Sequence, residues 1–246
     1  MNMRTSWLLV GAFTATAFTL TPAVALAQPS GPRAIIAPIP TSPEGQTYGR
    51  WAAAYWQWAL GIPAASNPVL DATGEYCAQR QVGEVWFLAG SFSSDPVVRA
   101  CEVPAGKSLF FPLINTAYFA FLNDPPETRT EEYVRAAGSC SVPAEISVTI
   151  DGFNIPRPTQ FFTGGSGSQS PIFNVQLPPG NVFGDDGTGI PELVLSPSAE
   201  QGYYLFVQPL RPGTHTIRWT ASGCGSGWSQ DITYNLTVVG DAGTDH

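Results

Sequence analysis

The sequence predicts an all-β protein: an antiparallel, two-sheet β-sandwich of the jelly-roll kind with an N-terminal aromatic helix. Three observations predict this class. Apolar and polar residues alternate in a series of short segments after residue 83, and turn signals such as Pro104-Ala105-Gly106 and Pro212-Gly213 separate them. Gly (25) and Pro (23) are too frequent among the 246 residues for a coiled coil. Several short strands in roughly 160 residues are typical of a sandwich.

Residues 1–27 have the pattern of a secretory signal peptide. Arg4 supplies the positive charge, residues 7–20 form an apolar segment too short to cross a bilayer comfortably, and residues 25–27 form a small-x-small cleavage site. We therefore expect the mature chain to begin at Gln28 and to be secreted, into the extracellular space or the periplasm. An uncleaved membrane anchor is the alternative. We expect no transmembrane segment after the signal is removed.

The exported part divides into three segments. Residues 28–46 are rich in proline, which predicts an extended, polyproline-like lead-in rather than a packed element. Residues 47–239 are expected to form a single β-sandwich domain, and residues 240–246 a flexible tail. No internal repeat divides this domain further.

Residues 48–60 predict the aromatic helix, with Thr47 as its N-cap and Pro63 beyond its end. Its large apolar side chains recur with a period of 3.6 residues at Trp51, Tyr55, Trp58 and Ile62. Only a narrow stripe is polar, so the helix should be buried on most sides. We expect it to cover an edge or an open end of the sandwich.

The strands are expected from alternation and turn signals, and one short exposed helix interrupts them. This helix occupies residues 124–137, where Asp124 can cap it, Pro125 can begin it, and Glu131 and Arg135 form an i, i+4 pair. The expected strands are 84–92, 97–102, 107–113, 144–151, 172–177, 203–209, 214–221 and 230–239.

Four cysteines, Cys77, Cys101, Cys140 and Cys224, follow the signal. An even number of cysteines in an exported chain favours disulfides, and three pairings are possible. We expect Cys77–Cys101, which are near in sequence, and Cys140–Cys224 by elimination. A metal site is the alternative, but the CxxC spacing of such sites does not occur and the chain has only two histidines.

Charge and histidine content exclude several classes of function. The formal net charge is −8 and Lys and Arg do not cluster, which argues against a nucleic-acid-binding protein. A hydrolase triad is not supported, because His246 is terminal, His215 is expected in a strand, and no G-x-S-x-G motif occurs. Glu84, Glu102 and Glu192 lie near expected strand ends, and no pair of carboxylates for glycoside cleavage can be selected from the sequence.

Two loops carry the candidate sites. Asp185 and Asp186 lie in the Gly-rich loop 181–189, whose oxygen ligands could hold calcium, the candidate cofactor. The alternative is a plain turn, because Asp-Gly pairs are common there. Trp228 follows a loop of small residues, 222–227, which could present a flat aromatic ring for stacking on a sugar. Its alternative role is to cover the disulfide at Cys224.

Several stretches together are similar to a group of exported bacterial β-rich proteins known only as hypothetical proteins. The stretches are residues 48–60, 83–90, 103–107, 110–112, 202–204, 210–217 and 233–235, and they span most of residues 48–239. The resemblance implies one exported domain and brings no activity with it.

We expect an exported, disulfide-linked β-sandwich with a non-catalytic binding or structural role at the cell exterior. An extracellular glycan or another cell-surface component is the expected partner. The alternative is a carbohydrate-active enzyme, a glycoside hydrolase or lyase, that uses acidic residues in a groove of the sandwich. Opposed carboxylates across a cleft would favour the enzyme, and an exposed aromatic surface would favour the binding protein.

Overall fold

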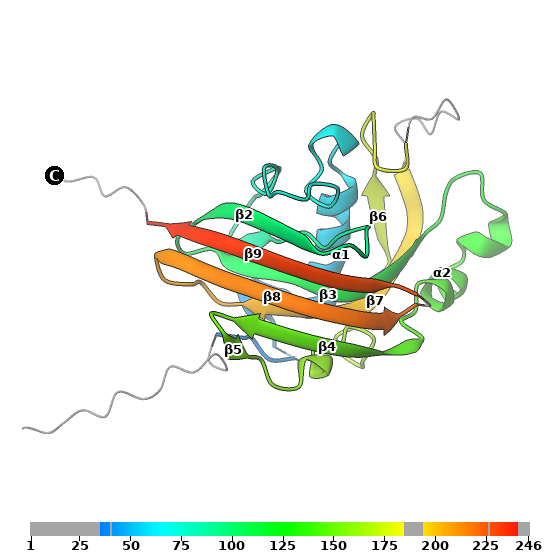
Figure 1. The fold of residues 1–246 in the computed structure, drawn as a ribbon. Coiled ribbons are helices and arrows are strands. Elements are labelled where there is room, and N and C mark those ends of the chain that lie inside the picture. The colour runs from blue at the N-terminus through cyan, green and yellow to red at the C-terminus, as the bar shows by residue number, and fades with distance from the viewer. Residues whose placement is uncertain (1–34, 40, 185–193, 226, 241–246) are drawn as a thin grey trace, which may run out of the picture.

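The computed structural model describes residues 35–39, 41–184, 194–225 and 227–240, and its strands form two sheets (Figure 1). Sheet A has the order β1-β3-β7-β6 and sheet B the order β2-β9-β8-β4-β5. The strands are β1 (Val85–Phe87), β2 (Val97–Pro104), β3 (Ser108–Phe119), β4 (Val142–Ile150), β5 (Phe153–Asn154), β6 (Phe173–Gln176), β7 (Val194–Val207), β8 (Gly213–Cys224) and β9 (Ser229–Val239). The all-β, two-sheet prediction is confirmed.

The sheets are mixed, so the expectation of a purely antiparallel sandwich is wrong. β1 pairs with β3 in parallel, and β2 pairs with β9 in parallel. Along the chain, β2 of sheet B comes between β1 and β3 of sheet A. β3 then runs in the same direction as β1. Each parallel pair therefore needs a crossover that alternating sequence does not reveal. The jelly-roll topology stays a prediction.

Each expected strand overlaps one observed strand, but the bounds differ. β7 is the largest departure, since it begins at Val194, well before the expected residue 203. β1 is shorter than expected, because only residues 85–87 pair with β3 as a ladder. β5 was not expected; it pairs with the end of β4 at Ile150 and Phe153.

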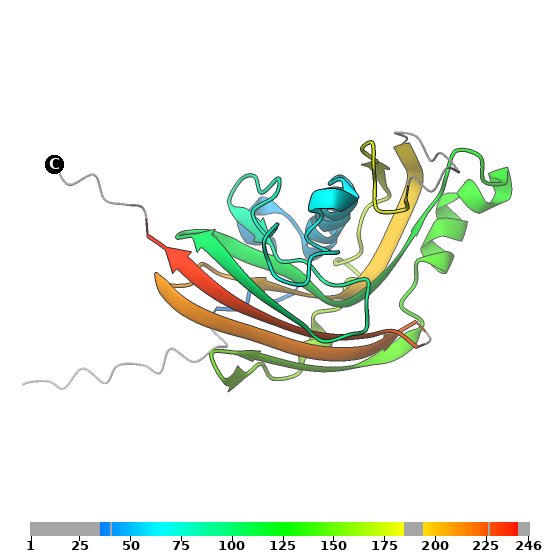
Figure 2. The ribbon, with the colours of Figure 1, turned by 45° about the horizontal axis from the view of Figure 1, so that its top comes forward.

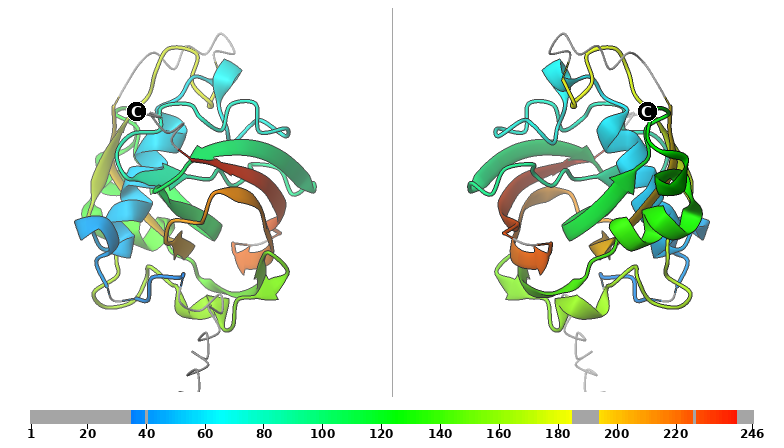
Figure 3. Two further views of the ribbon diagram at one scale, coloured as in Figure 1. Left: turned by 90° about the vertical axis from the view of Figure 1, so that its left-hand side faces the viewer. Right: turned by 90° about the vertical axis from the view of Figure 1, so that its right-hand side faces the viewer.

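Helix α1 (Tyr48–Leu60) forms as predicted, and the Thr47 side chain accepts a hydrogen bond from the backbone N–H of Arg50. It lies against a face of sheet A, not over an edge or an open end as expected. Tyr48 meets Phe110 of β3 edge-on at 5.9 Å, whereas the next residue, Phe111, stacks on Trp219 of sheet B at 5.0 Å. Successive side chains of a strand point to opposite faces, so α1 packs on the face of β3 that points away from Trp219. Figure 3 shows α1 next to β6 of sheet A.

The described part of the lead-in is packed, contrary to expectation. Ile36 and Ala37 are buried, Ile36 forms a bridge with Val207, and the Ala37 N–H donates to the carbonyl of Phe206. The apolar residues between the prolines extend sheet A at the end of β7. The short 3-10 helices η2 (Pro43–Gly45) and η3 (Ala64–Ser66) flank α1 on either side in the chain.

The second helical region is divided, unlike the single helix expected over 124–137. A 3-10 helix η4 (Pro126–Arg129) precedes α2 (Glu131–Ala137), and Thr130 caps α2 by accepting from the Tyr133 N–H at 3.2 Å. Asp124 instead accepts from the Phe121 N–H. The Glu131–Arg135 pair is present at 2.9 Å. Figure 2 shows α2 at the end of the molecule where β9 begins, with α1 above the sheets. A further turn, η5 (Pro158–Gln160), precedes β6.

Both predicted disulfides are confirmed. Cys77–Cys101 ties the segment after α1 to β2, and Cys140–Cys224 ties the segment after α2 to the end of β8. One hydrophobic cluster contains buried residues of α1 and of both sheets. Within the described ranges, no helix has the length and apolar character needed to cross a membrane.

Candidate functional site

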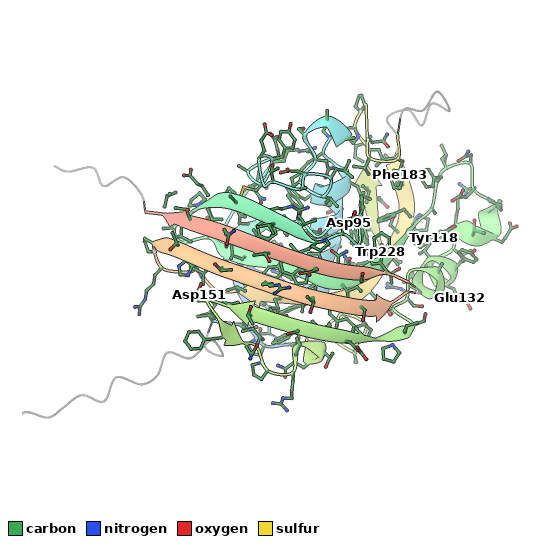
Figure 4. The ribbon with its side chains drawn as sticks, viewed as in Figure 1. Asp95, Tyr118, Glu132, Asp151, Phe183 and Trp228 are labelled. Carbon is green, nitrogen blue, oxygen red and sulfur yellow. A yellow bond between two sulfur atoms is a disulfide. The ribbon has the colours of Figure 1, made fainter. Side chains whose placement is uncertain are left out.

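A small pocket of about 100 Å³ lies beside Trp228, at the end of the molecule where β9 begins. Figure 4 labels Trp228 there, at the side of sheet B. Helix α1 contributes Tyr55 and Trp56, β3 contributes Asn115, and β9 contributes Gln230. Val69, after η3, and residues 90–92, between β1 and β2, complete the lining. The pocket thus joins residues that are far apart in the sequence.

Aromatic side chains form the mouth of the pocket. Phe92 and Trp228 both line it, and each is 39% exposed. Trp228 is therefore not buried, as it would be if it only covered the disulfide. Cys224 packs instead in a small cluster with Ile114 and Ala221. Two half-exposed rings at one pocket form the kind of surface on which a flat apolar ligand face can stack.

The polar groups of the pocket differ in whether they already form hydrogen bonds within the protein. The side-chain amide of Gln230 accepts from the Ser91 N–H and donates to the Ser91 carbonyl, both at 2.9 Å, so it is held by the backbone. The indole N–H of Trp56 is buried and has no partner among the described residues. The indole N–H groups of Trp86 and Trp219, which do not line the pocket, are also buried without a partner among the described residues, so this feature is not particular to the pocket.

Asn115 connects the pocket to a buried carboxyl group. Its Nδ2 donates to the Tyr204 hydroxyl at 2.8 Å, and that hydroxyl donates to Oε2 of Glu200 at 2.7 Å. Tyr204 and Glu200 lie on β7 two pleats apart and therefore share a face of sheet A. We call Asn115, Tyr204 and Glu200 the Glu200 chain.

Glu200 is poorly solvated for an ionised group. It is 1% exposed, and its Oε1 has no hydrogen-bond partner in the described part of the protein. The hydroxyl of Thr163 lies 3.5 Å from Oε2, but it lies closer, at 3.1 Å, to the carbonyl of Gly202. Burial raises the pKa of Glu200 to about 7, and the hydrogen bonds from Tyr204, Thr163 and Ser170 oppose that rise only in part.

A second buried charge lies behind the opposite wall of the pocket. Arg99 of β2 is 1% exposed, and Nη1 donates to the carbonyls of Ala89 and Gly90 and to the Tyr234 hydroxyl, at 2.6, 3.0 and 2.9 Å. Nε donates to the carbonyl of Asp71 at 2.7 Å, and Nη2 reaches the carbonyl of Val69 at 3.4 Å. Val69 and Gly90 line the pocket, so Arg99 fixes part of its wall.

The other acids expected from sequence do not form a site together. Glu84 is exposed and pairs with Lys107 at 3.7 Å, and Glu102 is exposed on β2. Asp185, Asp186 and Glu192 lie outside the described residues. Among the described residues, no group of three or more His, Cys, Asp or Glu side chains could hold a metal ion.

His215 lies in β8, as expected, and it has two acceptors. Its Nδ1 lies 2.7 Å from Asp151 Oδ2 and its Nε2 lies 2.8 Å from the carbonyl of Arg211. Partial burial lowers the pKa of His215, but the bonds to Asp151 and to that carbonyl outweigh it and raise the pKa above its ordinary value. Asp151 also accepts from the Thr216 N–H, so the group joins the β4–β5 turn to β8.

Sequence reasoning singled out Trp228, which the structure places at the pocket as a half-exposed side chain, and did not single out the two buried charges. Glu200 falls in the first half of β7, which was not expected to be strand. Extending the alternation backward from Tyr204 through Gly202 would have placed Glu200 on a buried face. Arg99 occupies an inward position of β2, between buried Val97 and Cys101, and this alternation was the available signal.

Comparison with known proteins gives no family for this chain. No family model matches it, and no curated protein matches it. Among solved structures, a cysteine protease inhibitor of Entamoeba histolytica matches with 15% identity and a TM-score of 0.21, covering 63% of this chain and 95% of the inhibitor. At that score the likeness carries no argument about fold or function.

Proposed function

We propose that the protein is a non-catalytic binding protein of the cell exterior and that the pocket beside Trp228 binds one ring of a neutral glycan. The observation that carries the proposal is the pair of half-exposed aromatic rings, Phe92 and Trp228, which line one pocket together with the polar side chain of Asn115. Sugars combine apolar ring faces with hydroxyl groups, and this pocket offers a counterpart to both.

The chemistry of the lining supports a sugar over other small ligands. The faces of Trp228 and Phe92 can stack on the C–H groups of a pyranose. A sugar hydroxyl group can donate its hydrogen to an oxygen such as Oδ1 of Asn115, which lines the pocket. The net charge of −8 disfavours anionic polymers at low salt, which is why we propose a neutral glycan.

The proposed location follows from the disulfides and the signal sequence. Disulfides persist in oxidising compartments outside the cytoplasm, and the chain has two. The signal peptide itself lies outside the described residues. A secreted protein that reaches the extracellular space or the periplasm would meet surface glycans there.

The pocket favours binding over the alternative of glycoside cleavage. Cleavage generally needs two carboxyl groups on either side of the scissile bond. No acidic side chain belongs to the lining residues that the structure describes, and Glu200 reaches the pocket only through Tyr204 and Asn115.

Binding can be measured by calorimetry with cellotetraose, maltotetraose and chitotetraose as neutral probes and tetragalacturonate as an anionic comparison. Trp228→Ala should weaken binding of the best neutral probe about 5- to 150-fold, equivalent to about 1–3 kcal/mol, because it removes a stacking ring. Unfolding stability should hardly change, because Trp228 is 39% exposed.

Phe153→Ala is the matched control, since Phe153 is an exposed aromatic on β5, away from the pocket lining. This variant should bind like the wild type. Equal loss of binding in both variants, or a neutral probe that binds Trp228→Ala unchanged, would contradict the assignment of the pocket. Absence of binding by every probe would contradict the glycan proposal.

A further inference from the structure

Asn115 is the polar side chain of the pocket whose orientation depends on a buried titratable group. An ionised carboxylate can only accept hydrogen bonds. When Glu200 is ionised, the Tyr204 hydroxyl must therefore donate to Oε2, and the oxygen of that hydroxyl is left to accept from Nδ2 of Asn115. In the structure Nδ2 of the Asn115 amide faces the Tyr204 hydroxyl at 2.8 Å, and that hydroxyl lies 2.7 Å from Oε2, which is the arrangement that this direction of donation requires.

A proton on Glu200 would reverse that direction. The protonated carboxyl has one hydrogen to donate, and the shortest polar contact of the carboxyl is the one at 2.7 Å between Oε2 and the Tyr204 oxygen. The proton, which comes from solvent, is therefore best placed on Oε2, donating to the oxygen of Tyr204. The Tyr204 hydrogen must then turn to Asn115, which can accept it only if its amide rotates by about 180° and offers Oδ1.

We propose, on the basis of the glycan-binding function above, that Glu200 is a specificity-determining residue: through Tyr204 it sets which atom of the Asn115 amide is left for the ligand. With Glu200 ionised, Oδ1 is left as an acceptor. With Glu200 protonated, Nδ2 is left as a donor. A sugar hydroxyl needs an acceptor for its own hydrogen, so the ionised state is the one that binds.

In the Glu200 chain and its surroundings, Glu200 is the group whose protonation state changes near neutral pH. Tyr204 on β7 and Tyr55 on α1 are the titratable neighbours, and burial raises the pKa of both hydroxyls, so both stay neutral. Helix α2 contributes Arg135, which donates to the carbonyl of Ser170 at 3.1 Å and pairs with Glu131. Burial also brings the pKa of Glu200 itself into the range where pH can act.

The orientation of Asn115 can be followed without any ligand. In ¹⁵N-labelled mature protein, with the Asn115 amide assigned by its loss in Asn115→Asp, the side-chain NH₂ signals should shift between pH 5.5 and 8.5 with a midpoint near that of Glu200. Glu200→Gln and Tyr204→Phe should both abolish the shift, the first by removing the titrating group and the second by breaking the chain. Glu102→Gln, an exposed acid on β2, should leave it unchanged.

The same variants test the effect on binding, with the best neutral tetrasaccharide as probe. Wild-type affinity should fall about 2- to 10-fold from pH 8 to pH 6, the loss of one hydrogen bond, and Tyr204→Phe should show no such change. An Asn115 signal that does not titrate, or affinity independent of pH in the wild type, overturns the role of Glu200 while leaving the sugar site standing. If no neutral probe binds but Asn115 titrates, the orientation of Asn115 is supported and the glycan function is overturned.

Discussion

Arg99 and Glu200 are both buried, carry opposite charges and come from different sheets, yet their surroundings differ. Arg99 meets four carbonyl groups and one hydroxyl, and its guanidinium carbon lies 5.5 Å from the centre of the Tyr234 ring. Glu200 has one close donor, Tyr204, and one oxygen without a partner in the described chain. A buried charge that is fully hydrogen-bonded organises backbone, whereas one that is incompletely bonded is free to change its protonation state.

The largest effect is expected at Arg99. Arg99→Met keeps much of the volume but leaves the carbonyls of Asp71 and Gly90 without their donor, whereas the carbonyl of Ala89 keeps the Tyr234 hydroxyl. Leaving buried polar groups unpaired should cost about 3–5 kcal/mol of unfolding free energy. Urea unfolding measures this loss directly.

Arg218→Met is the control on the same sheet, since Arg218 is exposed and pairs with Asp231 at 3.3 Å. Its loss should stay below about 1 kcal/mol. Equal stability of the two variants would show that the carbonyls around Arg99 do not depend on it, and the contrast between the two buried charges would fail.

A smaller effect on the unfolding free energy, opposite in sign to that at Arg99, is expected at Glu200. Its pKa is raised to about 7 in the folded protein, so between an unfolded value near 4.5 and pH 7 the folded state holds a proton that the unfolded state has lost. The contribution of Glu200 to stability is therefore greatest below pH 4.5 and is lost as the pH rises toward 7. The total change is about 3 kcal/mol.

Glu200→Gln should remove this dependence. Relative to the wild type, the variant should gain stability as the pH is raised from 5 to 8, in urea unfolding repeated at each pH. Glu102→Gln should run parallel to the wild type because Glu102 is exposed. A stability difference between Glu200→Gln and the wild type that is constant with pH would contradict the raised pKa.

The smallest effect on stability is expected for the pair of His215 and Asp151, whose side chains are both partly exposed. The pKa of His215 is raised, so its pairing with Asp151 stabilises the fold fully below about pH 6.5, the ordinary value for histidine, and this contribution is lost as the pH rises through the folded pKa. We expect less than about 1 kcal/mol, because the Asp151 side chain is 39% exposed. Asp151→Asn should flatten this part of the stability profile; a profile unchanged by Asp151→Asn would show that the pair does not act.

The sequence predicted the local elements better than the pairing of those elements. Thr47 and the aromatic period of residues 48–60 gave α1, because capping and amphipathicity are local properties. The parallel pairing of β2 with β9 was missed, since alternation shows which side chains are buried but not which strand lies next door. The face that α1 covers was also missed for this reason.

The pocket shows the same limit. Trp228 was identified from its loop of small residues, but its neighbours Trp56 and Asn115 come from α1 and β3, and no spacing in the chain links them. Glu200 was overlooked because β7 was expected to begin only at residue 203. Sequence can nominate an exposed aromatic; only the fold shows which buried groups stand behind it.

The position of β9 has a consequence for the order of events in folding. β9 is the last strand in the chain, yet it lies between β2 and β8, and Tyr234 meets Arg99 across 135 residues. Until Ser229–Val239 has been synthesised, β2 has no strand of sheet B beside it and Arg99 lacks the Tyr234 hydroxyl. Contacts so distant in sequence form slowly, so sheet B is completed only after the whole chain is available.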